Sequence, residues 1–409
     1  MPELLCPAGN MEKLRAVIAY GADAVYLSGK LYGMRSACEN FTREELAEAV
    51  AYAHERGVRV YVTVNVMPRT REYAELGGYI DFLDGVGVDA VIVSDIGVVS
   101  LVRERAKNLA IHISTQASVV SAEAARAWHS FGADRVVLAR ELTLREIKEI
   151  RENTPATLSL EAFVHGSMCI AYSGRCLLSN YFTGRDANRG ACSQPCRWNY
   201  TVRRVEVTEE KRPGTMIPIE EHDEGTFVMS SRDMCMIEHI PELVAAGIDS
   251  FKIEGRVKSA YYGAVTANAY RIAMDRYSAD PAGYVFDPAL MTELESVSHR
   301  EYCTGFYFGA PNEGANTVSS GGYLRDKSYL ATVISYDSAT GIACFRQKNK
   351  VCVGDEAEIV TPGSVGRRFC INEIFAEDGV AIESTPHPGM IYTAAVPFPV
   401  RAGDIMRSV

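Results

Sequence analysis

Along the first 260 residues, short apolar runs alternate with longer stretches in which apolar residues recur every three or four positions. The short runs are typical of strands buried on both faces of a parallel sheet, and the longer stretches are typical of amphipathic helices. Eight strands are predicted, at Leu4–Pro7, Ala24–Leu27, Val58–Val64, Ala90–Ser94, Ala110–Ser114, Arg135–Leu138, Ser159–Val164 and Ser250–Ile253. Helices are predicted between them, for example at Arg43–Arg56, Ser121–Phe131 and Leu144–Glu152.

Four of these strands follow a Gly-Ala/Val/Ile-Asp turn, which begins at Gly21, Gly87, Gly132 or Gly247. Glycine at such a position ends a helix and lets the chain re-enter the sheet. Eight strand–helix units predict an α/β fold, namely a (β/α)₈ TIM-like barrel over residues 1–277. An open doubly wound sheet is the alternative, because a strand count does not prove closure.

The regular alternation is interrupted once, between the seventh strand, which ends near His165, and the eighth, which begins at Ser250. The intervening segment is about twice as long as a strand–helix unit requires. It contains a cysteine-rich insert at residues 166–235. Because the insert follows a barrel strand, it is expected at the C-terminal face of the barrel, where active sites are built.

The pattern changes after a predicted helix at Ala260–Tyr277. Residues 278–322 are rich in Gly, Pro, Asn and aromatic residues and are interpreted as a linker that wraps around the barrel. From Tyr323 onward, short strands are separated by turn pairs such as Pro362-Gly363, which predicts a small C-terminal all-β barrel over residues 323–409. Its strands are expected at Tyr329–Tyr336, Ile342–Phe345, Ala357–Val360, Phe369–Phe375, Ala381–Glu383 and Ile405–Met406.

Composition excludes several classes of protein. Hydrophobic residues make up 47% of the 409 residues, which is enough to form packed cores and excludes a disordered or fibrous chain. No apolar run reaches the roughly 18 residues of a membrane span, and no secretory signal is visible, so a cytoplasmic protein without a membrane partner is expected. A net charge of −10 excludes binding of polyanions by bulk attraction.

Five of the eleven cysteines fall within 67 residues, at Cys169, Cys176, Cys192, Cys196 and Cys235. In a reducing compartment such clustering indicates metal or redox chemistry rather than disulfides. The paired C-x2-C spacing of a structural zinc site is absent, whereas iron–sulfur clusters accept irregular spacings. Five thiols compete for four corners of a cluster, so one is expected to be a neighbour. Five buried core cysteines are the alternative.

Positive charge surrounds these cysteines. Residues 165–204 contain six arginines and one acidic residue, Asp186, which gives a net charge of +5. Such charge stabilises thiolates and also attracts phosphates. Aromatic residues interleave with the arginines, as on a surface that binds unpaired RNA bases; the alternative is a solvated loop with packed aromatic anchors. These aromatic residues are Tyr172, Tyr181, Phe182, Trp198 and Tyr200.

Polar side chains near the predicted strand ends should converge on the mouth of the barrel. Arg140 and Arg256 are predicted to bind a dicarboxylate, because a guanidinium pairs with a carboxylate through two hydrogen bonds. Acid–base roles are predicted for His165, Glu254 and Glu161. The remaining expected substrate-binding residues are Lys252, Gln116 and Asn65. Ion pairs that close layers of the barrel are the alternative for several of these residues, and Glu161 in particular could be a buried partner of an arginine.

Longer motifs carry a resemblance to a known family. They are Glu161-Ala-Phe-Val-His-Gly-Ser-Met-Cys169, Ser173-Gly-Arg-Cys176, Cys192-Ser-Gln-Pro-Cys196, Ser231-Arg-Asp-Met-Cys235 and Phe251-Lys-Ile-Glu-Gly-Arg256. Over essentially its whole length, the chain resembles the collagenase-like peptidase family of unassigned catalytic type. Its length and C-terminal barrel resemble most closely the branch that forms 5-hydroxyuridine at the tRNA wobble position.

The resemblance implies a four-iron four-sulfur (4Fe-4S) cluster, which purification in air can remove or replace with zinc. It implies Cys169, Cys176, Cys192 and Cys235 as ligands, with Cys196 as the runner-up. It also implies oxygen-independent hydroxylation of RNA, with tRNA and an anionic small molecule such as prephenate as partners. An electron donor or partner protein is a further expected partner. Other relatives act on ribosomal RNA or on a ubiquinone precursor.

Two other functions are weighed against hydroxylation. A collagenase-like peptidase needs a nucleophile or a water activator, and the chain has neither an H-E-x-x-H helix nor a G-x-S-x-G elbow. A cysteine nucleophile stays open, since His165 lies four residues before Cys169, although thiolates that hold a cluster cannot attack a carbonyl. A non-catalytic RNA-binding protein with a structural metal is the third candidate. An RNA hydroxylation enzyme is the prediction.

Overall fold

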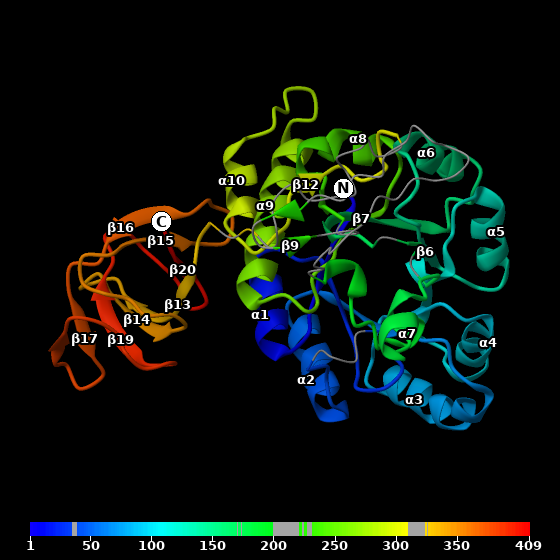
Figure 1. The fold of residues 1–409 in the computed structure, drawn as a ribbon, viewed down its shortest axis with the longest axis horizontal. Helices are drawn as coiled ribbons and strands as arrows, with labels where there is room; N and C mark the ends of the chain where they lie inside the picture. The colour runs from blue at the N-terminus through cyan, green and yellow to red at the C-terminus, as the bar shows by residue number, and fades with distance from the viewer. Residues whose placement is uncertain are drawn as a thin grey trace.

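A closed parallel barrel forms the larger part of the molecule (Figure 1). The computed structural model describes residues 1–34, 39–169, 171–172, 174–198, 221–222, 225–226, 231–309, 324 and 326–409. Among these residues, eight parallel strands follow one another around the barrel, and β11 pairs with both β1 and β7. This closure confirms the TIM-like barrel and excludes the open sheet. The strands are β1 (Glu3–Pro7), β2 (Ala24–Leu27), β3 (Arg59–Val64), β4 (Ala90–Val93), β5 (Ala110–Ile113), β6 (Arg135–Val137), β7 (Ser159–Ser167) and β11 (Ser250–Ile253).

Helices surround the barrel and bury their apolar faces against its strands (Figure 1). Local sequence fixes where several of them begin. Thr42 with Glu45 and Thr143 with Glu146 form capping boxes that satisfy free backbone N–H groups. The helices are α1 (Met11–Ala19), α2 (Arg43–His54), α3 (Tyr73–Gly85), α4 (Ile96–Arg105), α5 (Ala122–Ser130), α6 (Leu144–Glu152), α8 (Ile240–Ala245), α9 (Ala260–Ala279) and α10 (Ala289–Glu295). In the described segments, no helix combines the length and hydropathy needed to cross a bilayer.

The cysteine-rich insert adds short elements beyond the barrel. Strand β10 (Asp233–Cys235) pairs antiparallel with the end of β7, and β12 (Tyr302–Cys303) pairs with β10. The first part of the insert contains α7 (Leu178–Thr183) and the single turns η3 (Ala187–Arg189) and η4 (Pro195–Arg197). Elements this short carry no periodic pattern, and for that reason they were not predicted. Tyr200, Arg203 and Arg204 of the predicted basic segment lie outside the described residues.

The C-terminal part is an antiparallel sheet curved as a half-barrel around its own apolar core. Its strands are β13 (Tyr329–Asp337), β14 (Ile342–Gln347), β15 (Glu356–Val360), β16 (Arg367–Cys370), β17 (Ile374–Ala376), β18 (Ala381–Ile382), β19 (Ile391–Ala395) and β20 (Ile405–Ser408). The single strand predicted at Phe369–Phe375 is wrong. It is divided between β16 and β17, which lie in different parts of the sheet because the chain turns at residues 371–373.

The half-barrel packs against α1, α9 and α10 through specific polar contacts (Figure 1). The Tyr20 hydroxyl donates a hydrogen bond of 2.7 Å to the carbonyl of Val360. Arg407 is only 1% exposed, and its guanidinium lies 2.6 Å from Glu293 and 2.8 Å from Glu358. Glu293 belongs to α10, so this buried ion triad holds the half-barrel against the larger barrel.

Candidate functional site

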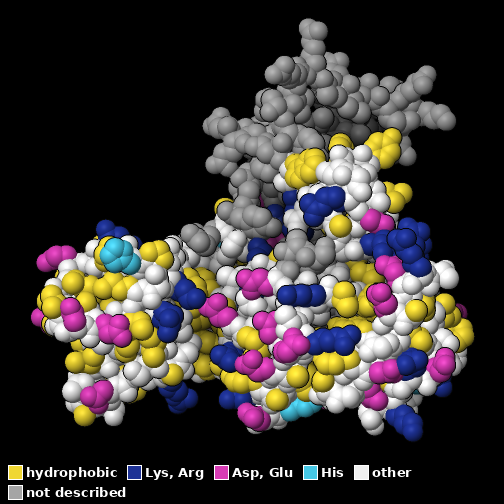
Figure 2. All heavy atoms as spheres, turned by 90° about the horizontal axis from the view of Figure 1, so that it is seen from below, with side chains coloured by type: hydrophobic (Ala, Val, Ile, Leu, Met, Phe, Trp, Pro, Cys, Tyr) yellow, Lys and Arg dark blue, Asp and Glu magenta, His cyan; other side chains and the backbone are white. Residues whose placement is uncertain are grey.

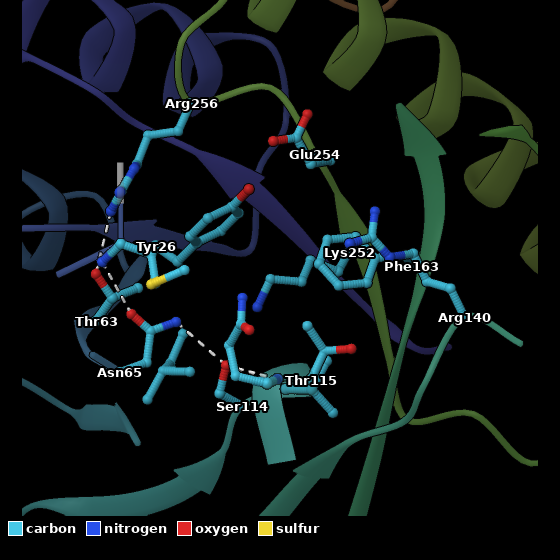
Figure 3. Close-up of a pocket in the computed structure, with 14 residues that line it drawn as sticks. Tyr26, Thr63, Asn65, Ser114, Thr115, Arg140, Phe163, Lys252, Glu254 and Arg256 are labelled. Carbon is cyan, nitrogen blue, oxygen red and sulfur yellow. Dashed lines mark hydrogen bonds between the residues drawn. The ribbon is translucent and has the colours of Figure 1, made fainter. Parts of the chain in front are cut away.

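A polar pocket opens at the C-terminal ends of the barrel strands (Figure 3). Its lining comes from β2, β3, β4, β6, β7 and β11 and from loops at the same ends of the strands, including the segment after β5. We call it the mouth pocket. The structure brings six of the predicted site residues together in its wall: Asn65, Gln116, Arg140, Lys252, Glu254 and Arg256.

Three cationic side chains of the mouth pocket are buried and held in place (Figure 3). Arg140 donates to the carbonyl of Ser167 at 2.7 Å, and its guanidinium carbon lies 4.7 Å from the centre of the Phe163 ring. Arg256 donates to the Thr63 hydroxyl at 3.1 Å. With Glu254 as the one carboxylate of the lining, the wall carries a net formal charge of +2. Such a wall is suited to a dianion.

Lys252 is the third of these cations. Its ammonium lies 2.6 Å from the Glu161 carboxylate and 4.5 Å from the centre of the Tyr26 ring. Burial lowers the pKa of Lys252 below its ordinary value, although the Glu161 carboxylate opposes the shift. The pair places a partly compensated positive charge at the base of the pocket.

Amide and hydroxyl groups complete the wall. Asn65 accepts a hydrogen bond from the Met34 backbone N–H at 3.1 Å and donates to Ser114 at 3.2 Å. Ser114 also accepts from the Gln116 backbone N–H at 3.3 Å. The side-chain oxygen of Gln116 is buried and has no hydrogen-bond partner among the described residues. It is therefore an acceptor available to a ligand.

A buried ion network closes the barrel beneath the mouth pocket. Glu161 is fully buried and accepts hydrogen bonds from Lys252 and, at 3.1 Å, from Arg135. Arg135 also lies 2.6 Å from Glu3 on β1, and Glu3 accepts a bond of 2.7 Å from Tyr61. Glu161 is not part of the pocket lining. The geometry therefore places Glu161 in the buried ion network rather than in an acid–base role. This is the alternative that the sequence left open, a buried partner of an arginine.

His165 also lies away from the mouth pocket. The pairing of β7 with β11 shifts register, so that Phe163 pairs with Lys252 whereas His165 pairs with Ile253. Such a bulge reverses the alternation of side chains along the strand. His165 consequently packs among the rings of Tyr262, Tyr270 and Tyr302, with centroid distances of 5.4 to 6.0 Å. Burial lowers the pKa of His165 to about 3, so its ring is neutral at physiological pH.

A second pocket adjoins the first and is lined by four of the clustered cysteines: Cys169, Cys176, Cys192 and Cys196. We call it the cysteine pocket. The Arg140 guanidinium lies 3.9 Å from the sulfur of Cys169, and the Gln194 backbone N–H lies 3.4 Å from the sulfur of Cys192. Burial raises the pKa of Cys196, the nearby Arg197 lowers it, and the three neighbouring thiols raise it further.

Cys235 is not part of this lining. It lies on β10 opposite His165, is only 6% exposed, and interacts with the hydroxyl of Tyr270. Burial raises the pKa of Cys235 to about 12. Of the five cysteines that the sequence singles out, the structure thus brings four together and separates the fifth.

The two pockets share part of their walls. Met34, Gln116 and Arg140 line both. Gly174, between Cys169 and Cys176, has a positive φ of 79°, and a Cβ atom there would lie 2.6 Å from the Gln116 carbonyl oxygen. Only glycine tolerates both this backbone conformation and this approach. The insert is therefore docked closely on the mouth of the barrel.

The side chains of the cysteine pocket make it a candidate cluster site, although in the described segments no group of three His, Cys, Asp or Glu side chains is already arranged to hold a metal ion. Four thiols around one cavity, with a guanidinium and a backbone N–H directed at two of them, match the donor set of an iron–sulfur cluster, in which each thiolate binds a different iron.

Several pocket residues were not predicted from the sequence. Tyr26 and Thr63 face the barrel interior, and strand alternation could have found them, since Thr63 lies two positions before Asn65. Phe163 lies two positions after Glu161 and carries the same signal. Met34 comes from a loop, where no sequence pattern indicates it. Asp95, directly after the predicted strand Ala90–Ser94, caps the N-terminus of α4.

The fold and these pockets define an α/β-barrel protein whose site lies at the C-terminal ends of the strands, beside a thiol-lined cavity. The chain belongs to peptidase family U32: residues 9–317 match that family, and residues 325–407 match its C-terminal domain. This confirms the resemblance inferred from the motifs.

Relatives in this family carry different names. The "tRNA hydroxylation protein P1" of Bacillus subtilis (strain 168) is 37% identical over 406 residues, which cover 99% of this chain and 94% of that protein. The "tRNA hydroxylation protein P" of Escherichia coli (strain K12) is also 37% identical, with 97% of this chain and 94% of that protein covered. A protein named "Collagenase" from Porphyromonas gingivalis is 32% identical over 88% of this chain and 86% of its own length.

Proposed function

We propose that this protein is an enzyme that hydroxylates tRNA, forming 5-hydroxyuridine at the wobble position. The observation that carries the proposal is the shared wall between the mouth pocket and the cysteine pocket. A substrate in the mouth pocket would contact Gln116 and Arg140, and the same two residues line the cysteine pocket. The names and near-complete coverage of the two bacterial tRNA hydroxylation relatives support tRNA as the substrate.

We further propose that Cys169, Cys176, Cys192 and Cys196 hold a 4Fe-4S cluster. When bound, such a cluster would supply one-electron transfer beside the mouth pocket. Arg140 would stabilise the thiolate of Cys169, because a cation within about 4 Å favours the charged form of a thiol. This ligand set replaces Cys235, the fourth ligand implied by family resemblance, with Cys196.

The side chains of the mouth pocket suit an anionic co-substrate such as prephenate. The bond from Arg140 to the carbonyl of Ser167 and the bond from Arg256 to the Thr63 hydroxyl fix the orientation of the two guanidinium groups, and a planar guanidinium is suited to a carboxylate. Lys252 adds a positive charge at the base of the pocket. Glu254, half-buried at the mouth, is the carboxylate of the lining that could accept or donate a proton.

The side-chain oxygen of Gln116, which has no hydrogen-bond partner among the described residues, supports a uracil base as the second ligand. Uracil presents an N–H donor beside a carbonyl acceptor, and a glutamine amide offers the complementary pair. The described residues that line the two pockets include no histidine. Among these residues, a cysteine–histidine nucleophile of the peptidase type would find no histidine to act as its base.

The experiment has two parts. First, the protein is purified without oxygen and its iron, sulfide and visible spectrum are measured. Serine replacements of the four pocket cysteines should each lose most of the iron, whereas Cys235→Ser and the control Cys344→Ser should keep it. If Cys235→Ser loses iron and Cys196→Ser keeps it, the ligand set implied by the family resemblance is right instead. If none of the variants loses iron, the cluster proposal fails.

Second, tRNA nucleosides are analysed from a strain that lacks the gene and from the same strain supplied with parent or variant protein. The deletion strain should lack 5-hydroxyuridine and its derivatives. The parent protein should restore these nucleosides, whereas the Arg256→Met protein should not. Unchanged levels of these nucleosides in the deletion strain would refute tRNA as the substrate.

A further inference from the structure

The first part of the cysteine-rich insert exposes several aromatic side chains. Tyr181 and Phe182 on α7 are 91% and 51% exposed, and Trp198 after η4 is 37% exposed. Tyr172, between Cys169 and Cys176, is 47% exposed. Figure 2, in which the face turned toward the viewer in Figure 1 points upward, shows hydrophobic side chains exposed on the lobe that rises from this face. Aromatic side chains gathered on a surface mark an interaction site.

These rings rest on a fixed base. Phe182 and Trp198 pack edge to face with their centroids 6.0 Å apart. The indole N–H of Trp198 donates to the carbonyl of Ser193 at 3.1 Å. The hydroxyl of Ser193 in turn lies 2.9 Å from that of Ser179 on α7 and 3.1 Å from that of Thr183. A ligand that covers the rings would therefore find them already positioned.

The charges beside the rings identify the kind of ligand. Arg175 and Arg185 are exposed, and no described acidic side chain forms an ion pair with either. Arg189, in contrast, is paired with Glu72 at 2.8 Å. Exposed rings with exposed guanidinium groups close by along the chain are the combination that binds single-stranded nucleic acid, because bases stack on the rings and phosphates pair with the cations.

We infer that Tyr172, Tyr181, Phe182 and Trp198 form a stacking platform for unpaired RNA bases next to the nucleotide that enters the barrel. The placement supports this, since Tyr172 lines the cysteine pocket, which shares Gln116 and Arg140 with the mouth pocket. Base-paired nucleotides hide their faces, so the platform selects a loop over a stem. The inference rests on the proposed function, in which the RNA is a tRNA. It adds that the unpaired loop of this tRNA binds to the platform.

The chain provides its own probe for this test, because it contains two tryptophans, Trp128 and Trp198. Trp128→Phe leaves Trp198 as the one indole fluorophore. Titration of the anaerobically purified protein with an unmodified anticodon stem-loop RNA should quench its emission. A duplex of equal length should not. In the Trp198→Phe protein, the emission of Trp128 should stay unchanged in both titrations.

Tyr181→Ala and Phe182→Ala should each weaken binding of the stem-loop roughly 5- to 150-fold, the range of base–aromatic stacking. Tyr181 is almost fully exposed, so its truncation should leave the fold and the iron content intact. The matched control is Phe131→Ala. Phe131 is 47% exposed after α5, at the end of the barrel opposite the mouth, and its removal should leave binding unchanged.

Two results would overturn the platform. They are equal affinities of the parent and both variants for the stem-loop, or equal quenching by loop and duplex. Failure of the platform is separate from failure of the proposed function. If only the platform is wrong, the variants bind RNA as the parent does, but a deletion strain still lacks 5-hydroxyuridine. If the proposed function is wrong, the nucleosides of the deletion strain stay unchanged, independent of the RNA affinity of the variants.

Discussion

Replacing His165 by Phe tests whether this histidine is a buried neutral ring or an acid–base catalyst. The ring lies among three tyrosines, and neither of its nitrogens has a hydrogen-bond partner in the described structure. Burial lowers its pKa to about 3 in the folded state, whereas an exposed histidine in the unfolded chain titrates near about 6.5. Below that pH the unfolded state binds a proton that the folded state does not. The stability that His165 provides is therefore lost as the pH falls from about 6.5 toward 3.

From these two pKa values, the free energy of unfolding of the parent should fall by about 1.4 kcal/mol between pH 7.5 and pH 5.5 because of His165. The Phe variant should not show this decrease. Urea unfolding followed by tryptophan fluorescence measures the difference. Trp128 and Trp198 both precede the half-barrel, so their signal reports the larger barrel. His54→Phe, on the surface of α2, is the matched control. A free-energy difference between parent and variant that is the same at both pH values would refute the buried neutral ring.

Three further changes test other parts of the structure. Arg407→Met leaves Glu293 buried without its cation and should cost about 3–5 kcal/mol in urea unfolding; a loss below 1 kcal/mol would show that the triad does not hold the half-barrel. Gly174→Ala forces a side chain against Gln116 at positive φ and should weaken the docking of the insert on the barrel by about 1–2 kcal/mol. A protease should then cleave the insert faster while the free energy of global unfolding stays the same, and unchanged proteolysis would contradict this docking. Arg140→Lys removes a planar donor pair, so calorimetry should find a dicarboxylate bound roughly 10-fold more weakly, and equal affinity would exclude Arg140 from the anion site.

Much of the mouth pocket could be predicted because one rule places it. The C-terminal ends of parallel strands meet at one face, so polar residues at those ends, such as Asn65 and Lys252, are expected to lie at one mouth. The count of strand–helix units favoured a closed barrel, and the pairing of β11 with both β1 and β7 showed the closure. The rule fails at His165, because one extra residue in β7 reverses the side-chain alternation, and sequence alone does not reveal a bulge.

The arrangement of the cysteines was beyond the sequence for a different reason. Clustering along the chain indicated a shared site, but it did not show which of the five thiols is the neighbour, and the family resemblance favoured Cys235 over Cys196 as the fourth ligand. Their separation depends on β10, a strand of three residues whose pairing with β7 carries no periodic signal. The division of the predicted strand Phe369–Phe375 could not be predicted for a similar reason. The short segment between β16 and β17 contains no glycine or proline, the residues that most often indicate a turn.

The ion network beneath the mouth pocket has a kinetic consequence. Because Glu3, Arg135, Glu161 and Lys252 form buried ion pairs beneath it, the mouth pocket opens, among the residues that the structure describes, toward the face that carries the insert. A macromolecule that covers this face blocks the path of any small ligand. On the proposed function, a small anion would then bind before the large substrate, and its remnant would leave after the large product. Steady-state kinetics of the two ligands should accordingly follow a compulsory order, with the large substrate at high concentration trapping the small one inside.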